Sequence, residues 1–118
     1  STYSDTGLSA SITPTSSTSK ILVIVDTNGC RKSNDTNLML KLLRGSTTLT
    51  MIEGIGGRTP SGVSLNSFGA CSISYLDSPA TTSSTTYAVY FKRTQGTATI
   101  QSSLRGTTNT ITLMEIAQ

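Results

Sequence analysis

Hydrophobic and polar residues alternate in short runs along most of this chain, and Gly, Pro and Asn separate the runs. Alternation with a period of two predicts half-buried β-strands, because successive side chains of a strand point to opposite faces. We predict eight strands; a helix over 38–43 is the less favoured alternative, because Thr, Gly and Asn flank that segment. The strands cover Thr6–Ile12, Lys20–Asp26, Leu38–Arg44, Thr48–Glu53, Phe68–Leu76, the segment of Tyr87, Val89 and Phe91, Ala98–Leu104 and Thr110–Ala117.

The segments between the strands are polar or rich in Gly. Asn28-Gly29 predicts a turn, and the polar residues that follow it as far as Asn37 predict an exposed loop. Gly45-Ser46 predicts a short hairpin connection. The segment 54–66 contains four Gly and one Pro, so it predicts a long irregular loop.

Eight short strands in 118 residues predict a single domain over residues 1–118. We predict the class all-β: a two-sheet antiparallel β-sandwich, with a jelly roll as the favoured topology and an immunoglobulin-type arrangement as its competitor. The chain has no Trp, so the Cys-Trp-Cys signature of immunoglobulin domains is absent. Hydroxyl-rich segments after Pro14 and after Pro79 are similar to each other, which predicts two equivalent corners of the sandwich; a chance likeness of two Ser/Thr-rich loops is the alternative.

Strand parity predicts which side chains face the core, and shortening a large one should leave a cavity. We expect Phe91→Ala to destabilise the fold by about 3–5 kcal/mol. The residues predicted to face inward are Leu8, Ile12, Val23, Val25, Leu40, Ile73, Tyr75, Tyr87, Val89, Phe91, Ile100, Ile111 and Leu113.

Composition changes this picture mainly at the surface. Ser and Thr fill 41 positions, whereas only 13% of the residues are charged, so hydroxyl groups rather than ion pairs are expected to cover the sandwich. The net charge of +3 comes from basic residues spread along the chain without a basic stripe, so nucleic acid is not an expected partner. No apolar stretch approaches the ~20 residues of a membrane-spanning helix, and we expect no membrane insertion.

The residue types that catalysis needs are scarce. The chain has no His, so a hydrolase would depend on Ser or Thr beside Lys, a neighbourhood that is inevitable among so many hydroxyls. The six carboxylates form no local pair of the kind that glycosidases use. Asp26-Thr27-Asn28-Gly29 lacks the spacing and the terminal Glu of a calcium loop. We therefore predict no catalytic residues, no metal site and no cofactor.

Cys30 and Cys71 have different surroundings in the sequence. Cys71 alternates with core residues, whereas Cys30 follows the predicted turn in a charged segment. We favour two free thiols, with a disulfide as the alternative.

Three segments are apolar on both faces, which a sandwich with one solvated face does not require. They are Ile21–Val25, Leu38–Leu43 and Ile111–Ile116. We predict that a subunit interface covers the second face and that the chain forms a homo-oligomer, with a trimer favoured. Loops folding over these strands within one chain are the alternative. The predicted interface residues are Leu22, Ile24, Met39, Leu43, Met114 and Ile116.

The two longest polar, Gly-rich connections, Arg31–Asn37 and Gly56–Asn66, are the candidate binding loops, because recognition concentrates in loops on a rigid frame. The alternative is that they are solvated connections. The candidate binding residues are Arg31, Lys32, Asn34, Asp35, Asn37, Arg58 and Asn66.

Several segments along the whole chain carry a family resemblance: residues 5–14, 19–23, 42–46, 76–82 and 111–117. The most specific of them are the corner Asp77-Ser78-Pro79-Ala80-Thr81-Thr82 and the ending 111–117. On these segments the chain resembles small β-rich virion proteins and fibre-terminal domains of tailed bacteriophages, especially marine and cyanobacterial ones. The resemblance implies a binding or structural role with no catalytic residues to carry over.

Resemblance and composition together predict a non-enzymatic virion structural protein on the particle surface. The favoured role is a trimeric sandwich in a tail or head fibre that attaches to a glycan or protein of the host cell. In one version of this role, the chain is the C-terminal part of a longer fibre protein. The alternative is a capsid decoration protein that clamps other virion proteins. A carbohydrate-binding module ranks lower, because only Tyr3 and Tyr90 are candidates for stacking on a sugar.

Overall fold

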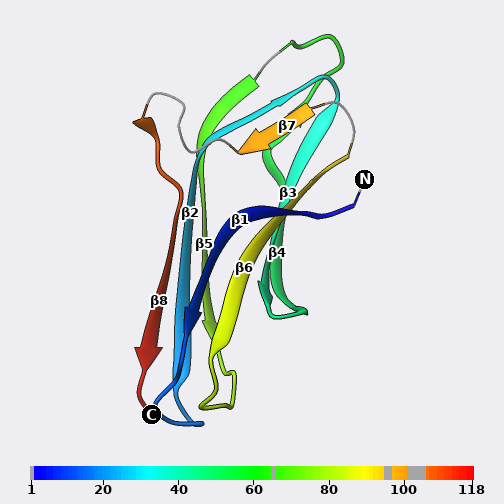
Figure 1. Cartoon of the computed structure of the whole chain (residues 1–118). Coiled ribbons are helices and arrows are strands. Elements are labelled where there is room, and N and C mark those ends of the chain that lie inside the picture. The colour runs from blue at the N-terminus through cyan, green and yellow to red at the C-terminus, as the bar shows by residue number, and fades with distance from the viewer. Residues whose placement is uncertain (1, 65, 95–96, 101–105) are drawn as a thin grey trace.

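The computed structural model describes residues 2–64, 66–94, 97–100 and 106–118, and these residues form eight strands in two antiparallel sheets. The sheets pack face to face in an elongated body of 52 × 28 × 19 Å (Figure 1). The predicted two-sheet antiparallel sandwich is therefore confirmed, and the segment 38–43 is a strand rather than a helix.

Sheet A has the order β1 (Ser4–Ile12), β6 (Thr85–Arg93), β3 (Thr36–Arg44) and β4 (Thr47–Thr59). Sheet B has the order β5 (Asn66–Asp77), β2 (Lys20–Ser33) and β7 (Thr97–Ile100), and β8 (Thr110–Ile116) also pairs with β2. The jelly-roll connectivity is not confirmed by this order.

Strand β2 is the central strand of sheet B, and it continues through the residues that predicted a turn. Its first half pairs with β8 and its last residues pair with β7, while β5 lines its other edge. Asn28-Gly29 lies inside the strand at a β-bulge, where the register with β5 shifts between Thr27 and Cys30. Gly29 has φ 63°, a conformation that a bulge exploits and that Gly adopts without strain. The predicted end of this strand at Asp26 is therefore wrong.

The connection between β2 and β3 is a two-residue turn instead of the long loop that the polar residues predicted. Asn34 and Asp35 have φ 58° and 61°, left-handed conformations that Asn and Asp tolerate well, and they carry the chain from β2 of sheet B to β3 of sheet A. The Thr36 hydroxyl donates to the carbonyl of Ser33 at 2.5 Å and braces the turn.

Strand β4 also continues beyond its predicted end at Glu53, as far as Thr59. The register of β3 against β4 shifts between Thr36 and Leu38 and again between Leu38 and Leu40, so bulges absorb the Gly-rich stretch within the ladder. The irregular connection to β5 therefore starts only at Pro60, and the predicted loop over 54–66 is wrong in its first six residues.

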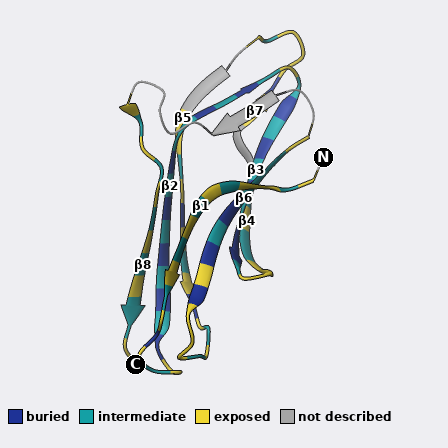
Figure 2. Ribbon diagram, in the orientation of Figure 1, coloured by how far each residue is buried: buried dark blue, intermediate teal, exposed yellow. Residues whose placement is uncertain are grey.

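The core lies between β2 of sheet B and the strands β3 and β6 of sheet A, where Figure 2 shows the buried residues concentrated. Of the residues predicted to face inward, six are buried: Val23, Val25, Leu40, Ile73, Tyr87 and Val89. Six others pack against this core while remaining partly exposed: Leu8, Ile12, Tyr75, Phe91, Ile111 and Leu113. Because Phe91 is among the second group, we now expect Phe91→Ala to fall at the low end of its range. The side chain of Ile100 lies outside the described residues, as do the last residues of the predicted strand Ala98–Leu104.

The two similar hydroxyl-rich segments are equivalent corners, as predicted. Residues 13–19 lead from β1 of sheet A to β2 of sheet B, and residues 78–84 lead from β5 of sheet B back to β6 of sheet A. Both corners lie at the end of the sandwich that holds the C-terminus (Figure 1). The first corner is tied to β8, because the Glu115 carboxylate accepts hydrogen bonds from the amide and the hydroxyl of Thr15, both at 2.8 Å.

A buried ionic network also links the sheets at this end. Asp77, at the end of β5, accepts hydrogen bonds from Arg44 of β3 at 2.8 Å and from the hydroxyl of Tyr87 of β6 at 2.8 Å. Arg44 and Tyr87 are cross-strand partners within sheet A, so one carboxylate of sheet B is held by two strands of sheet A. Burial, followed by the Asp77 carboxylate, raises the pKa of Tyr87 well above its usual value.

Candidate functional site

The described carboxylates are mainly engaged in structural contacts. Asp77 is buried in the inter-sheet network, Asp35 is paired with Arg58, and Glu115 is bonded to the first corner. Over residues 2–64, 66–94, 97–100 and 106–118, no group of three or more His, Cys, Asp or Glu side chains could hold a metal ion.

The two loop regions predicted to bind a partner come together at one end of the sandwich. We call this end the tip and define it as Asn34, Asp35, Arg58 and residues 60–63. The amide of Asn34 donates to the carbonyl of Val63 at 3.0 Å, and the amide of Asp35 donates to the carbonyl of Pro60 at 3.2 Å. The β2–β3 turn is thus docked on the β4–β5 connection by main-chain hydrogen bonds.

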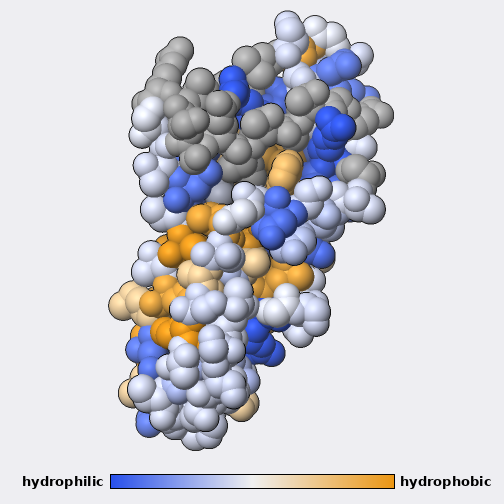
Figure 3. Space-filling view, in the orientation of Figure 1, coloured by the Kyte–Doolittle hydropathy of each residue, from blue (hydrophilic) through white to orange (hydrophobic). Residues whose placement is uncertain are grey.

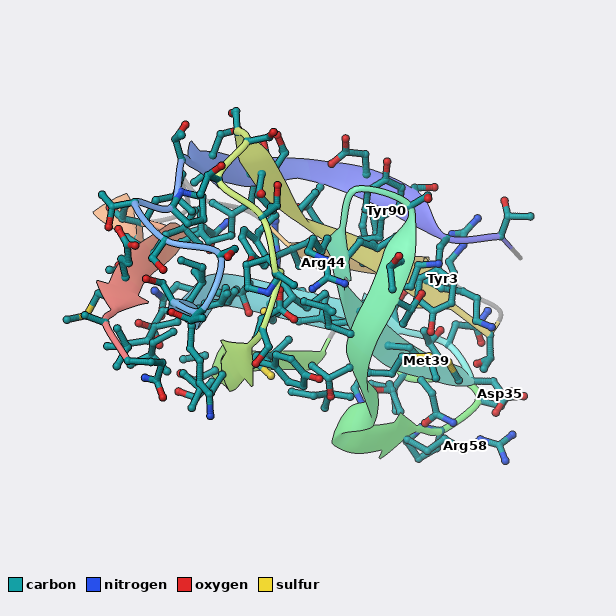
Figure 4. All side chains as sticks on the ribbon, turned by 90° about the horizontal axis from the view of Figure 1, so that it is seen from below. Tyr3, Asp35, Met39, Arg44, Arg58 and Tyr90 are labelled. Carbon is teal, nitrogen blue, oxygen red and sulfur yellow. The ribbon has the colours of Figure 1, made fainter. Side chains whose placement is uncertain are left out.

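Side chains reinforce this docking. The guanidinium of Arg58 donates from Nε and Nη2 to one carboxylate oxygen of Asp35, and Figure 4 shows both residues together at the same end of the molecule. The side chain of Arg58 is 66% exposed, whereas that of Asp35 is 24% exposed. The ion pair consequently leaves the cation facing solvent, where a partner can reach it.

The surroundings of the tip are basic. Arg31 and Lys32 lie at the end of β2 and Lys92 and Arg93 at the end of β6. Lys32 is buried and Arg31 and Lys92 are half-buried, so the exposed basic side chains described in this half of the fold are Arg58 and Arg93. Figure 3 shows strongly hydrophilic residues over this half, above the hydrophobic residues gathered near β1 and β8. An acidic partner is the kind that this surface attracts.

The structure moves several of the predicted binding residues out of loops. Arg31 is half-buried within β2, and Lys32 is 1% exposed, so burial lowers the pKa of its ammonium group. Asn37 lies in β3, where its main-chain amide donates to the hydroxyl of Thr94 at 3.0 Å and its carbonyl accepts from the amide of Thr94 at 3.2 Å. Asn66 begins β5, and its side chain lies outside the described residues. Asn34, Asp35 and Arg58 are the predicted residues that the tip brings together.

The predicted interface residues divide between the two outer faces. Leu22, Ile24, Met114 and Ile116 lie on the outer face of sheet B, whereas Met39 and Leu43 belong to sheet A on the other side of the molecule. Leu43 is buried between β4 and β6 and does not contribute to an exposed patch. The single patch of six residues that we predicted is therefore wrong.

One residue that the prediction missed completes the patch on sheet B. Leu76 of β5 and Met114 of β8 are the cross-strand partners of Leu22 on either side. Leu76 is 51% exposed and Met114 is 48% exposed, so the three side chains form an apolar row across the sheet. Leu76 is the last residue of a predicted strand and follows Tyr75, which was predicted to face inward. Because successive side chains of a strand alternate, the sequence could have placed Leu76 on the outer face.

The two cysteines lie near each other in sheet B, and both are free thiols. Cys71 pairs with Thr27, and Cys30 follows the bulge and faces the core, fully buried, rather than a charged loop. Burial raises the pKa of both thiols, and Cys30 raises that of Cys71 further. Neither thiol has the low pKa that a nucleophile needs.

A small groove opens beside the bulge of β1, at the edge where β1 of sheet A meets β8 of sheet B. Its volume is about 90 Å³, and Thr6, Leu8, Phe91 and Asn109 are among the residues that line it. The hydroxyl of Thr6 donates to the carbonyl of Val89 at 2.6 Å, and the side chain of Asn109 accepts from the amide of Asn28 at 2.6 Å. These polar groups are therefore engaged in contacts within each sheet.

Among the described segments, none is a helix with the length and hydrophobicity to span a bilayer. Comparison with protein-family models, with curated proteins and with solved structures found no match to this chain.

Proposed function

We propose that this chain is a non-enzymatic surface protein of a tailed-bacteriophage virion, acting in a tail or head fibre and contacting the host cell through the tip. The resemblance of residues 5–14, 76–82 and 111–117 to phage fibre-terminal domains and virion proteins supports the particle location. A rigid, hydroxyl-covered sandwich supports a binding or structural role.

The observation that carries the proposal is the docking of the β2–β3 turn on the β4–β5 connection. Main-chain hydrogen bonds and the pair of Arg58 with Asp35 hold the tip in one conformation before any partner arrives. A pre-ordered surface loses little conformational entropy on binding. Since Arg58 remains exposed in a basic setting, the partner is an acidic glycan or protein surface of the host cell.

The rival role, a capsid decoration protein, is favoured by a different observation. The apolar row of Leu76, Leu22 and Met114 lies far along the sheet from the tip and suits contact with another protein chain. In the fibre role this row packs against a second copy of the chain within a homotrimer. In the decoration role it packs against the capsid shell.

Electron microscopy with gold-labelled antibody separates these roles. An antibody is raised against the purified chain and applied to particles from a lysate in which the chain is made. Gold at fibres or tail tips is the expected result. Gold spread over the head shell would overturn the fibre role in favour of decoration, and particles without gold, in a lysate that contains the chain, would overturn the virion proposal.

A further inference from the structure

The outer face of sheet A carries a second cluster of polar and aromatic side chains, most of them half-buried, which is separate from the tip. It consists of Tyr3, Lys41, Tyr90, Lys92 and Met51, and we call it the tyrosine-lysine cluster. Tyr90 and Lys41 are cross-strand partners on β6 and β3, and Met51 of β4 is the next partner of Lys41. Tyr3 precedes β1, and its hydroxyl reaches the sulfur of Met51 at 3.8 Å. The cluster therefore joins three strands of sheet A, β6, β3 and β4, to the residue that precedes β1.

Two ammonium groups converge on one aromatic ring in this cluster. The Nζ atom of Lys41 lies 4.3 Å from the centre of the Tyr3 ring, and that of Lys92 lies 4.9 Å from the same centre. Lys41 is also 5.9 Å from the centre of the Tyr90 ring. Cation–π contacts hold both cations over the face of the sheet and against the aromatic surface.

Among the side chains that the structure describes, the ion pairs join Arg44 to Asp77 and Arg58 to Asp35, and neither pair includes these two lysines. Asp5 is opposite Tyr90 in the ladder, and its carboxylate accepts a hydrogen bond from the amide of Gly7 at 2.8 Å. Two like charges fixed on one ring form a site that favours an anion.

We propose that the tyrosine-lysine cluster binds an acidic sugar residue of a polysaccharide, with Lys41 and Lys92 on its carboxylate and the Tyr rings against its ring. Aromatic side chains offer flat apolar faces to the C–H groups of a sugar, and ammonium groups bind the acidic substituent. A single-stranded nucleic acid also needs aromatic and basic groups, but it needs a basic groove that follows its backbone. The cluster has two lysines on a sheet face, so a single acidic sugar fits it better.

The test uses the whole purified chain and does not depend on a virion location. Titration calorimetry measures binding of a galacturonic acid tetramer, of its methyl ester as the matched neutral ligand, and of an oligothymidylate of similar length. We expect the acidic tetramer to bind and the methyl ester to bind at least about tenfold more weakly, which corresponds to ~1.4 kcal/mol. No binding of the acidic tetramer at millimolar concentration, equal binding of the ester, or tighter binding of the oligothymidylate would each overturn the proposal.

Variants locate the binding. Lys41→Gln and Lys92→Gln should each weaken binding of the acidic tetramer by about fivefold to tenfold, which is the scale of one charge-assisted contact. Lys20→Gln is the matched control, because Lys20 lies on sheet B opposite Ile116 and loses the same charge. If Lys20→Gln weakens binding as much as the other two, the attraction is a general effect of net charge and the site is refuted. Melting temperatures within about 3 °C of the wild type confirm that each variant is folded.

Discussion

Removing the hydroxyl of Tyr87 tests one hydrogen bond that joins the two sheets, the bond from Tyr87 to Asp77. Tyr87 is fully buried, and its hydroxyl donates to Asp77 at 2.8 Å while Arg44 holds the same carboxylate. Tyr87→Phe removes one oxygen atom and keeps the ring in the core. Asp77 keeps its ion pair, so the variant tests the hydrogen bond rather than an unpaired buried charge.

The magnitude follows from the charge of the acceptor. A hydrogen bond to a charged group contributes roughly 1.5–3 kcal/mol to stability, more than a bond between neutral groups. For a domain of this length, 1 kcal/mol corresponds to roughly 4 °C in melting temperature, so we expect a fall of about 6–12 °C. Tyr90→Phe is the matched control, because Tyr90 is half-buried on the outer face and its loss of a hydroxyl should change stability by less than about 0.5 kcal/mol.

Thermal unfolding followed by circular dichroism at neutral pH measures both variants. The pKa of Tyr87 is raised in the fold, so the stabilising contribution is complete below the phenol's unfolded pKa and is lost as the pH rises through the folded pKa. The gap between wild type and Tyr87→Phe should therefore narrow above about pH 10. A Tyr87→Phe protein that melts within 2 °C of the wild type (roughly 0.5 kcal/mol), or a Tyr90→Phe protein that falls as far, would refute the reasoning.

Three further predictions concern acid stability, assembly and the thiols. Hydrogen bonds from Ser19 and Thr15 lower the pKa of Glu115, so the stability that this carboxylate contributes is present above its unfolded pKa and is lost as the pH falls through its folded pKa. In melting curves from pH 7 to pH 3, roughly spanning the carboxyl range, the wild type should therefore lose its higher melting temperature relative to Glu115→Gln. A difference that stays constant over this range would contradict the prediction. Light scattering should find a homo-oligomer that Met114→Asp dissociates, whereas a wild-type monomer at micromolar concentration would contradict the interface. Thiol titration after denaturation without reductant should find that both Cys30 and Cys71 react, and in the folded protein both thiols should react slowly. If neither thiol reacts after denaturation, the two cysteines form a disulfide.

Much of the fold follows from local alternation in the sequence. Val23 and Val25 occupy alternate positions of one strand, and Tyr87 and Val89 do so in another, and all four lie in the core as their parity predicted. Alternation specifies which face a residue occupies wherever a strand is regular, because a register slip of one residue would expose the core face.

Bulges and long-range contacts could not be predicted in this way. Asn28-Gly29 has the residues of a turn, and only the pairing of β5 with the residues before and after it makes it a bulge within β2. The same limit applies to the candidate sites. Arg58 reaches Asp35 from another strand, and Lys41 and Lys92 meet Tyr3 from separate elements, so no local motif marks either group of residues.

Particle adsorption with Arg58→Ala, measured beside the melting of the purified variant, tests most directly the central claim that a rigid sandwich binds the host through its tip. The exposed ion pair of Arg58 with Asp35 contributes only about 0–1 kcal/mol, so the variant should melt within about 4 °C of the wild type. Loss of an exposed cation from the binding surface should reduce adsorption by about fivefold or more, whereas Lys20→Ala on sheet B should leave adsorption unchanged. Arg58→Ala particles that adsorb like the wild type, whether or not the purified variant melts lower, would contradict the account.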